Sequence, residues 1–390
     1  MKQLRVMSVF GTRPDTIKMA PVVRALGMHR DVDDLVCVSA QHRQMLDDLL
    51  ALFSIAPDYD LDVMTEDQTL TDVTTRVLLR MERVLSDARP DVVLVHGDTT
   101  TSSAAALAAF YRQIPVGHVE AGLRTGNRWL PYPEEMNRRL TAAIASYHFA
   151  PTRLARENLL RENVAAADVV VTGNTVIDAF LETAQRTDLP APPRWNEIDP
   201  RRPTIVVTAH RRENHPHMAQ ICEALRDIAG LPSRPQLYWP VHPSPHVAPV
   251  AHETLDGIGG VLLVNPVGYA EMVAAVRNAS FVLTDSGGLQ EEAPCLGKPV
   301  LVMRDETERP EGLAAGTLRL VGHDRGRIVE AARELLADAS AYAAMARAAN
   351  PYGDGHAADR IAAWLIARLR GGEYPLPFDA EPVRAAAAGG

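Results

Sequence analysis

Three acidic residues stand at or just beyond the ends of apolar segments in the first half of the chain. Asp98 follows VVLVHG, Glu120 follows PVGHV, and Glu134 lies in PYPEEMNRR. An open parallel sheet gathers its ligand groups where its strands end, so carboxylates delivered in this way converge on one place. Proton transfer to and from a substrate is the chemistry that such a set of acids would perform.

Two of these acids have an equally simple structural interpretation. Asp98 precedes three threonines and an alanine-rich run, which is typical of a helix N-cap. Glu134 stands at the start of a helical segment, where the helix dipole favours any acid. Glu120 is harder to explain in this way, because a carboxylate behind VGHV would be partly desolvated, as groups that transfer protons often are.

A histidine followed by two arginines ends an apolar run in the second half. His210 follows TIVVTA and precedes Arg211 and Arg212, a setting suited to receiving a negatively charged leaving group. His242, in PVHPSPH, is flanked by prolines and indicates a loop or binding residue. Neither histidine belongs to a spaced ligand set such as HExxH, so the sequence predicts no metal site.

The stretch TDSGGLQEEA carries the most ligand-specific pattern. Ser286, Gly287 and Gly288 are small enough for backbone N–H groups to approach a diphosphate at a helix start. Glu292, one turn further along, could accept hydrogen bonds from both hydroxyls of a ribose. The alternative is an ordinary glycine turn before a helix that begins with acids.

The turn FGTRPDTIKMAP leaves the first apolar segment through a single glycine. It lacks GxGxxG, so a nicotinamide or flavin fingerprint is missing and we expect no cofactor. The turn instead supplies Arg13 and Lys18, which could meet an anion at the start of the next helix. Taken singly, both cations could equally be solvated surface residues.

Apolar segments alternate with helical patterns in both halves of the chain, which predicts parallel sheets covered by helices on both faces. The expected fold class is α/β, with two Rossmann-like doubly wound domains. The expected strands lie at 4–11, 34–40, 91–98, 116–121 and 146–152 in the first half, and at 203–210, 236–243, 260–267, 280–288 and 299–304 in the second.

We expect the first domain to span 1–170 and to be completed by a C-terminal helix around 356–370. The second domain spans 171–355. The segment 188–203 is dense in proline and charge and indicates an irregular loop. The tail 371–390 has glycine, proline and an alanine stretch, and we expect it to be disordered.

Bulk properties bound the remaining possibilities. A length of 390 residues favours two domains. The net charge of −9 gives no basic field for nucleic acid or an anionic membrane. No signal peptide and no spanning apolar run is evident, so a cytoplasmic location is expected. The three cysteines are far apart and form no CxxC, which argues against disulfides and zinc.

Taken together, several motifs resemble the non-hydrolysing bacterial UDP-N-acetylglucosamine 2-epimerases over residues 4–370. They are FGTRPDTIKMAP, VHGDTTT, GHVEAGLRT, PYPEEMNRR, TGNTVIDA, TAHRREN, TDSGGLQEEAPCLGKPV, RDETERPEG and NPYGDG. The resemblance implies the GT-B architecture, with two domains facing a central cleft and the nucleotide held mainly by the second. It also implies a homodimer and a role in cell-envelope polysaccharide biosynthesis.

The activity implied is interconversion of UDP-GlcNAc and UDP-ManNAc through elimination of UDP and a 2-acetamidoglucal intermediate. Asp98, Glu120 and Glu134 match the catalytic acids of the family, and His210 matches its active-site histidine. Other positions match its UDP-sugar contacts: Arg13, Lys18, Arg211, His242, Ser286, Gly287, Gly288, Glu292 and Arg309.

Bacterial members also bind a second UDP-GlcNAc as an activator, through residues that resemble Gln41, Gln44, Arg211 and His242. Asp67 stands where those relatives tend to have arginine, which speaks against the activator site here. Two smaller departures are Asp15, where the family usually has glutamate, and Ser244, where it usually has asparagine.

Three alternatives remain open from the sequence. A GT-B glycosyltransferase would share the fold and the nucleotide site, although the chain shows no acceptor-binding signature. A hydrolysing 2-epimerase would share the residue types. A nucleotide-sugar sensor without catalysis would be expected to lose one of the four catalytic residues, and all four are present.

Overall fold

The computed structural model describes residues 3–39, 43–65 and 67–379, and these form two compact α/β units. Unit 1 comprises residues 3–179 and 353–379, and unit 2 comprises Phe180–Tyr352. The first boundary therefore falls after Ala179 and not at residue 170. The reason is that Asp178 accepts a hydrogen bond of 2.8 Å from the backbone N–H of Ala358, which ties this stretch to the last helix of unit 1.

Unit 1 is built on a seven-stranded parallel sheet with the order β3-β2-β1-β4-β5-β6-β7. Its strands are β1 (Leu4–Phe10), β2 (Val32–Val38), β3 (Tyr59–Asp60), β4 (Val92–His96), β5 (Val116–Val119), β6 (Tyr147–Ala150) and β7 (Val169–Val171). Its helices are α1 (Arg13–Gly27), α2 (Arg43–Leu52), α3 (Leu70–Ala88), α4 (Thr100–Tyr111), α5 (Glu134–Ile144), α6 (Arg153–Arg161) and α15 (Ala357–Arg370), with a 3-10 turn at Ala166–Asp168. Helix α7 (Thr175–Gln185) crosses from unit 1 into unit 2.

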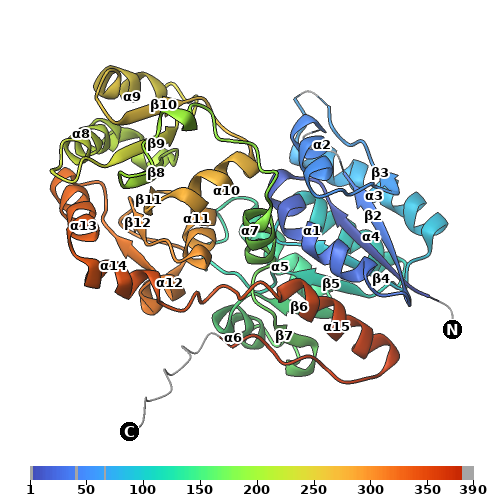
Figure 1. The fold of residues 1–390 in the computed structure, drawn as a ribbon. Coiled ribbons are helices and arrows are strands. Elements are labelled where there is room, and N and C mark those ends of the chain that lie inside the picture. Colours follow the sequence, from blue (N-terminus) through green and yellow to red (C-terminus); the bar gives the residue numbers. More distant parts are fainter. Residues whose placement is uncertain (1–2, 40–42, 66, 380–390) are drawn as a thin grey trace, which may run out of the picture. The chain divides into compact units, whose positions relative to one another are not determined.

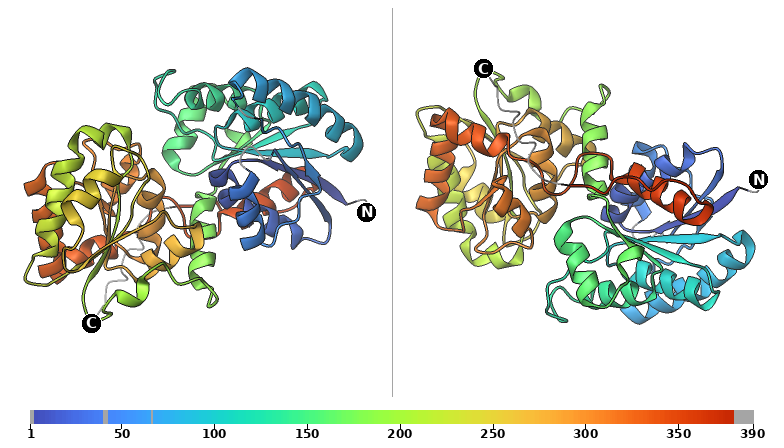
Figure 2. Two further views of the ribbon diagram at one scale, coloured as in Figure 1. Left: turned by 90° about the horizontal axis from the view of Figure 1, so that it is seen from above. Right: turned by 90° about the horizontal axis from the view of Figure 1, so that it is seen from below.

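Helices cover both faces of this sheet, as Figures 1 and 2 show. Side chains of α1, α2 and α15 form one core with the strands, and those of α3 and α4 form another on the opposite face. Helix α15, red in both figures, comes from the far end of the chain and packs beside α1. Its Trp364 packs edge-on against Phe149, with ring centroids 5.5 Å apart.

The first nine residues of the segment expected to be disordered are instead packed on unit 1. The backbone N–H of Phe378 donates to the carbonyl of Val171 at 2.8 Å, beside the edge strand β7. The Phe378 ring is buried and lies beneath the guanidinium of Arg360. The Phe378 ring, this backbone hydrogen bond, the ion pair of Arg153 with Asp379 at 2.6 Å and the contact between the Tyr374 and Trp364 rings hold a stretch whose composition indicates a loose tail. Residues 380–390 lie outside the described residues.

Unit 2 is built on a six-stranded parallel sheet with the order β10-β9-β8-β11-β12-β13. Its strands are β8 (Thr204–Thr208), β9 (Gln236–Pro240), β10 (Val261–Val264), β11 (Phe281–Thr284), β12 (Val300–Val302) and β13 (Leu318–Leu320). Its helices are α8 (Met218–Ala229), α9 (Ala248–Leu255), α10 (Tyr269–Asn278), α11 (Gly287–Glu292), α12 (Pro310–Ala315), α13 (Arg325–Ala337) and α14 (Ala339–Ala346), with 3-10 turns at Trp195–Glu197, Arg212–His217 and Ala293–Leu296.

Many of the strands follow from sequence runs that are largely apolar. β4 and β8 are buried throughout, as expected of parallel strands with helices on both faces. The strand order reverses between β1 and β4 in unit 1 and between β8 and β11 in unit 2. Ligands of such sheets bind beyond the carboxyl ends of the strands at this switch point. The two observed sheets confirm the predicted α/β fold of two Rossmann-like domains. No helix of the described residues is long and apolar enough to cross a membrane.

Candidate functional site

Glu120 is a buried acid at the carboxyl edge of unit 1. It directly follows β5, and its side chain is only 8% exposed. Its φ of +61° lies in the left-handed region, which is costly for a residue with a side chain and is found where the surroundings impose it. The β-strand therefore delivers this carboxylate through a strained turn.

Three groups from other elements surround the Glu120 carboxylate. Lys18 on α1 forms an ion pair with Oε1, and Asn174 Nδ2 donates to the same oxygen at 2.9 Å. His96 Nε2 lies 3.5 Å from Oε2. Lys18, expected to meet a substrate anion, thus lies against Glu120, so the cation and the acid act together.

His96 and Asp15 continue this network away from Glu120. His96 ends β4 and its Nδ1 lies 3.2 Å from Oδ1 of Asp15 in the first turn of α1. Both side chains are buried, and Oδ2 of Asp15 has no hydrogen-bond partner in the described part of the chain. Sequence reasoning missed His96, although its place as the last residue of a buried strand next to Gly97 is a signal.

Asp98 is not the N-cap of α4. Thr99 is, since its hydroxyl accepts a hydrogen bond of 3.2 Å from the backbone N–H of Ser102. The Asp98 carboxylate instead pairs with Arg138 on α5, with Nε at 2.9 Å and Nη2 at 2.7 Å from Oδ2. Asn137 fixes the same residue by donating to its backbone carbonyl. The charge-assisted pair orients Asp98 at the sheet edge.

The adjacent acids Glu134 and Glu135 differ sharply in their surroundings. Glu135 is fully buried and accepts backbone hydrogen bonds from Thr125 at 3.0 Å and Gly126 at 3.3 Å. Burial alone would raise the pKa of Glu135, but these hydrogen bonds and the charge of Arg138 outweigh it and the pKa is lowered. Glu135 therefore holds the loop before α5. Oε2 of Glu134 is buried without a hydrogen-bond partner among the described residues, as an oxygen meant for a ligand would be.

A buried histidine supports the turn that carries Asp98. His118 on β5 contacts the backbone carbonyl of Gly97 through Nε2 at 2.8 Å. Complete burial lowers the pKa of His118 to about 3, so the ring is neutral at neutral pH. Its place is structural: it fixes the backbone between His96 and Asp98.

In unit 2, His210 is organised by a buried acid that sequence reasoning missed. Asp285 directly follows β11, and its Oδ2 accepts from the backbone N–H groups of His210 and Arg211, each at 2.8 Å. Asn214 donates to the same oxygen, and Nδ1 of His210 lies 3.2 Å from Oδ1. Desolvation lowers the pKa of His210, helped by the nearby Arg211 and opposed by Asp285.

The turn Ser286–Gly288 at the start of α11 is bordered by two cations. A Cβ placed on Gly287 would lie 3.3 Å from Nη2 of Arg211 and 4.0 Å from Nη2 of Arg309. A Cβ on Gly288 would lie 3.5 Å from the Glu292 carboxylate. Both guanidinium groups and the backbone of the turn therefore share one small region, which suits an anion.

A second acid sets the position of Arg309. Nε of Arg309 forms an ion pair with the buried carboxylate of Glu291, while its backbone N–H donates to Thr307 at 3.1 Å. The two glutamates of the QEE sequence thus have separate surroundings, with Glu291 holding an arginine and Glu292 folded back towards Gly288. This arrangement keeps a cation at the glycine turn.

The remaining predicted residues are at the surface or outside the described part. Arg13 begins α1 and is exposed, and His242 is exposed with its ring stacked on His210 at 6.0 Å. Of the possible activator residues, Gln41 lies outside the described residues, as does the side chain of Gln44. Arg211 and His242, the other two, lie together at the His210 edge of unit 2.

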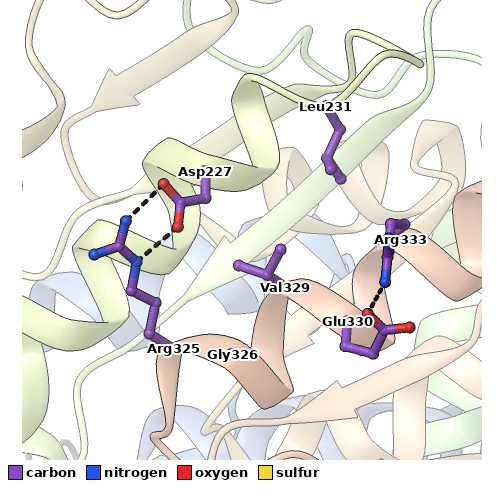
Figure 3. Close-up of a pocket in the computed structure, with 7 residues that line it drawn as sticks. All are labelled: Asp227, Leu231, Arg325, Gly326, Val329, Glu330 and Arg333. Atoms are coloured by element: carbon purple, nitrogen blue, oxygen red, sulfur yellow. Dashed lines mark hydrogen bonds and ion pairs between the residues drawn. The ribbon is translucent and has the colours of Figure 1, made fainter.

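A groove on unit 2, shown in Figure 3, does not belong to this site. It has a volume of about 400 Å³ and lies between α8 and α13. Arg325 pairs with Asp227 at 2.6 Å and Arg333 pairs with Glu330, so the charges of the groove neutralise one another. Within the described residues, no group of three or more His, Cys, Asp and Glu side chains could hold a metal ion.

These features define the class of the protein: an α/β protein of two doubly wound units, one carrying a set of acids and the other a glycine turn bordered by two arginines. A family model described as UDP-N-acetylglucosamine 2-epimerase matches residues 24–366. A UDP-N-acetylglucosamine 2-epimerase of Escherichia coli K12 is 53% identical over 367 residues, covering 92% of this chain and 97% of the relative.

Solved structures of similar sequence point to the same family. A crystal structure of a UDP-N-acetylglucosamine 2-epimerase from Listeria monocytogenes, described as putative, has a TM-score of 0.91 at 46% identity and covers 97% of this chain and 100% of its own. The crystal structure of the Neisseria meningitidis UDP-GlcNAc 2-epimerase bound to UDP-GlcNAc has a TM-score of 0.85 at 45% identity. It covers 93% of this chain and 100% of its own. The chain belongs to the UDP-N-acetylglucosamine 2-epimerase family.

Proposed function

We propose that the protein interconverts UDP-N-acetylglucosamine and UDP-N-acetylmannosamine without releasing free sugar. The observation that carries the proposal is the enclosed Glu120 carboxylate, held by Lys18 and Asn174 at the carboxyl edge of unit 1. It supplies a positioned proton-transfer group in a chain whose relatives are named for this epimerisation.

The reaction is an elimination followed by re-addition. A carboxylate removes the proton from carbon 2 while the bond between carbon 1 and the UDP oxygen breaks, which leaves a double bond between carbons 1 and 2. UDP then adds again at carbon 1 as a second group protonates carbon 2 from the other face. Separate acid and base groups are needed around the ring, and we assign them to Asp98, Glu120 and Glu134.

Unit 2 supplies the groups for UDP in this proposal. The backbone of Ser286–Gly288 and the guanidinium groups of Arg211 and Arg309 bind the diphosphate, and Glu292 binds the ribose hydroxyls. His210 stabilises the departing UDP. The short distances from Arg211 and Arg309 to Gly287 support this assignment, since several donors around a leaving diphosphate stabilise the charge that develops on it. Arg13, Lys18 and His242 complete the proposed UDP-sugar contacts.

Product analysis tests the proposal. The protein is incubated with UDP-GlcNAc alone, and the mixture is analysed by anion-exchange chromatography and proton NMR. An equilibrium mixture of UDP-GlcNAc and UDP-ManNAc is expected. Free ManNAc with UDP would identify a hydrolysing enzyme, and no conversion without an acceptor would point to a glycosyltransferase.

We also propose a homodimer formed through unit 1 and a cytoplasmic location. Helices α3, α4 and α5 pack against one another and expose the apolar side chains Leu79, Phe110, Tyr111 and Leu140. The free cysteines Cys37, Cys222 and Cys295 suit a reducing compartment. Light scattering after gel filtration tests the dimer. The wild type is expected to have the mass of a dimer and Phe110→Glu that of a monomer. A wild type with the mass of a monomer contradicts the proposal. Cell fractionation tests the cytoplasmic location.

A further inference from the structure

Asp15, His96 and Glu120 form a chain of three titratable side chains beneath the carboxyl edge of unit 1. They are 3%, 2% and 8% exposed. The imidazole of His96 stands between the two carboxylates, with Nδ1 3.2 Å from Asp15 and Nε2 3.5 Å from Glu120. The Asp15–His96 contact therefore reaches Glu120 from the Oε2 side.

Each member of the chain is held by a different element. The backbone of Asp15 is fixed in the first turn of α1, where its N–H donates to the hydroxyl of Thr12. The backbone carbonyl of His96 accepts a hydrogen bond of 2.5 Å from Ser102 on α4. Oε1 of Glu120 is occupied by Lys18 and Asn174, which leaves Oε2 towards His96.

Two buried carboxylates around one imidazole determine where a proton must lie. If Nδ1 donates its hydrogen to Asp15, a neutral ring presents a lone pair at Nε2 to Oε2 of Glu120, and two acceptors repel. The contact is attractive when a proton lies between them.

Further groups of the described residues face this chain of contacts. Lys18 on α1 faces Glu120 from the Oε1 side. His118 on β5 is near His96, but burial lowers its pKa to about 3, so it is neutral at neutral pH. Asn174 is uncharged. Among these groups, His96 is the side chain that lies on the Oε2 side of Glu120.

We propose that Asp15 and His96 are positioning residues that hold Glu120 ionised and correctly oriented for proton transfer at carbon 2. This inference rests on the function proposed above. Asp15 fixes the imidazole ring, and the Nε2–H of His96 lies towards Oε2 of Glu120. Because the reaction is reversible, the carboxylate that takes the proton from carbon 2 in one direction returns it in the other, and His96 retains its own protons throughout.

The test is the pH dependence of kcat in variants of the two residues. His96→Gln is expected to lower kcat by about 100-fold, with KM for UDP-GlcNAc within about threefold. The acid limb of its pH profile moves to higher pH, because Glu120 without the imidazole N–H beside Oε2 takes up a proton more readily. Asp15→Asn is expected to move the acid limb in the same direction and to lower kcat by about tenfold. Asp15→Glu keeps the carboxylate and is expected to retain the wild-type pH profile.

His148→Gln is the matched control, because His148 is a buried histidine on the neighbouring strand β6 and lies outside this chain of contacts. It is expected to keep the wild-type kcat and pH profile. An unchanged acid limb in His96→Gln and Asp15→Asn would overturn the proposal, even if kcat fell, because a structural role lowers kcat without moving the limb. If His96→Gln does not fold, Asp15→Asn decides.

Failure of this inference is distinguishable from failure of the proposed function. A wild-type protein that exchanges no proton at carbon 2 with solvent contradicts the proposed function itself. A wild-type protein that exchanges this proton, together with variants that do so at the same rate and with the same pH profile, contradicts only the role of Asp15 and His96.

Discussion

The candidate groups of the two units differ in how they are held. In unit 1 the acids are locked to side chains from other elements: Glu120 to Lys18 and Asn174, and Asp98 to Arg138. In unit 2 the candidate groups are a glycine turn and cations near the surface, held by the buried acids Asp285 and Glu291.

The difference teaches what each kind of chemistry requires. A group that moves a proton needs a fixed orientation and a controlled charge, and burial among partners provides both. A group that captures an anion from water needs donors that a ligand can reach, and backbone N–H groups and half-exposed arginines provide these. On this view, variants of the acids in unit 1 change kcat, and variants of the glycine turn and its arginines in unit 2 change affinity.

The largest expected effect is in unit 1. Glu120→Gln keeps the shape of the side chain but removes the proton-accepting charge, so kcat is expected to fall by about 1,000-fold while the Kd for UDP stays within about threefold. Steady-state kinetics and calorimetry measure the two values. Glu162→Gln is the control, since Glu162 is also a paired carboxylate of unit 1 and contacts Arg124. A parallel loss of UDP binding in Glu120→Gln would break the comparison.

A variant of the cation at the glycine turn is expected to show the opposite behaviour. Arg211→Ala removes a guanidinium group that borders Gly287, so KM and the Kd for UDP are expected to rise by about 10- to 100-fold with kcat within about fivefold. Arg212→Ala, at the exposed neighbouring position, is expected to change neither value by more than about twofold. The comparison is contradicted if Arg211→Ala lowers kcat and leaves UDP binding intact.

The buried acid of unit 2 is expected to matter for stability. Asp285→Asn removes the charge that accepts three hydrogen bonds, which is expected to cost about 2–3 kcal/mol of unfolding free energy. Urea denaturation, with hydrogen exchange in unit 2, measures this cost. Asp256→Asn is the matched control: Asp256 pairs with His252 at 3.0 Å but both are exposed, so the expected change is under about 0.5 kcal/mol. Equal effects of the two variants would contradict this account.

A smaller effect concerns the buried histidines of unit 1. Burial lowers the pKa of His148 to about 4, below the value near 6.5 expected in the unfolded chain. The unfolded state therefore binds more protons between pH 6.5 and 4, so stability falls as the pH falls through this window. Between pH 6.5 and 5.5, His148→Gln is expected to lose about 1 kcal/mol less unfolding free energy than the wild type. Urea titrations at the two pH values measure it, and an unchanged slope would contradict the burial argument.

The sequence predicted the local parts of both units well. Glu120 lies directly after a buried strand, and Ser286–Gly288 lies between a strand and a helix, because these features depend on neighbours in the chain. The α/β fold was equally accessible, since ten of the strands follow from apolar runs, whereas the short strands β3, β7 and β13 were not predicted.

The partners of these residues were not predicted, because they depend on the order of the strands. The reversal between β1 and β4 brings Asp15 to His96, and that between β8 and β11 brings Asp285 to His210, although 75 or more positions separate each pair. The N-cap interpretation of Asp98 was wrong because the adjacent Thr99 caps α4. The burial of Phe378 was not predicted either, because it depends on the edge strand β7, which is distant in the sequence.

The most direct test of the division between the units is the fate of the proton at carbon 2. The protein is incubated with UDP-GlcNAc in deuterated water and the nucleotide sugars are followed by proton NMR. Loss of the carbon 2 proton signal from both UDP-GlcNAc and UDP-ManNAc is predicted for the wild type and for Arg211→Ala at saturating substrate, and its retention is predicted for Glu120→Gln. Epimerisation that leaves the original proton on carbon 2 would contradict the account.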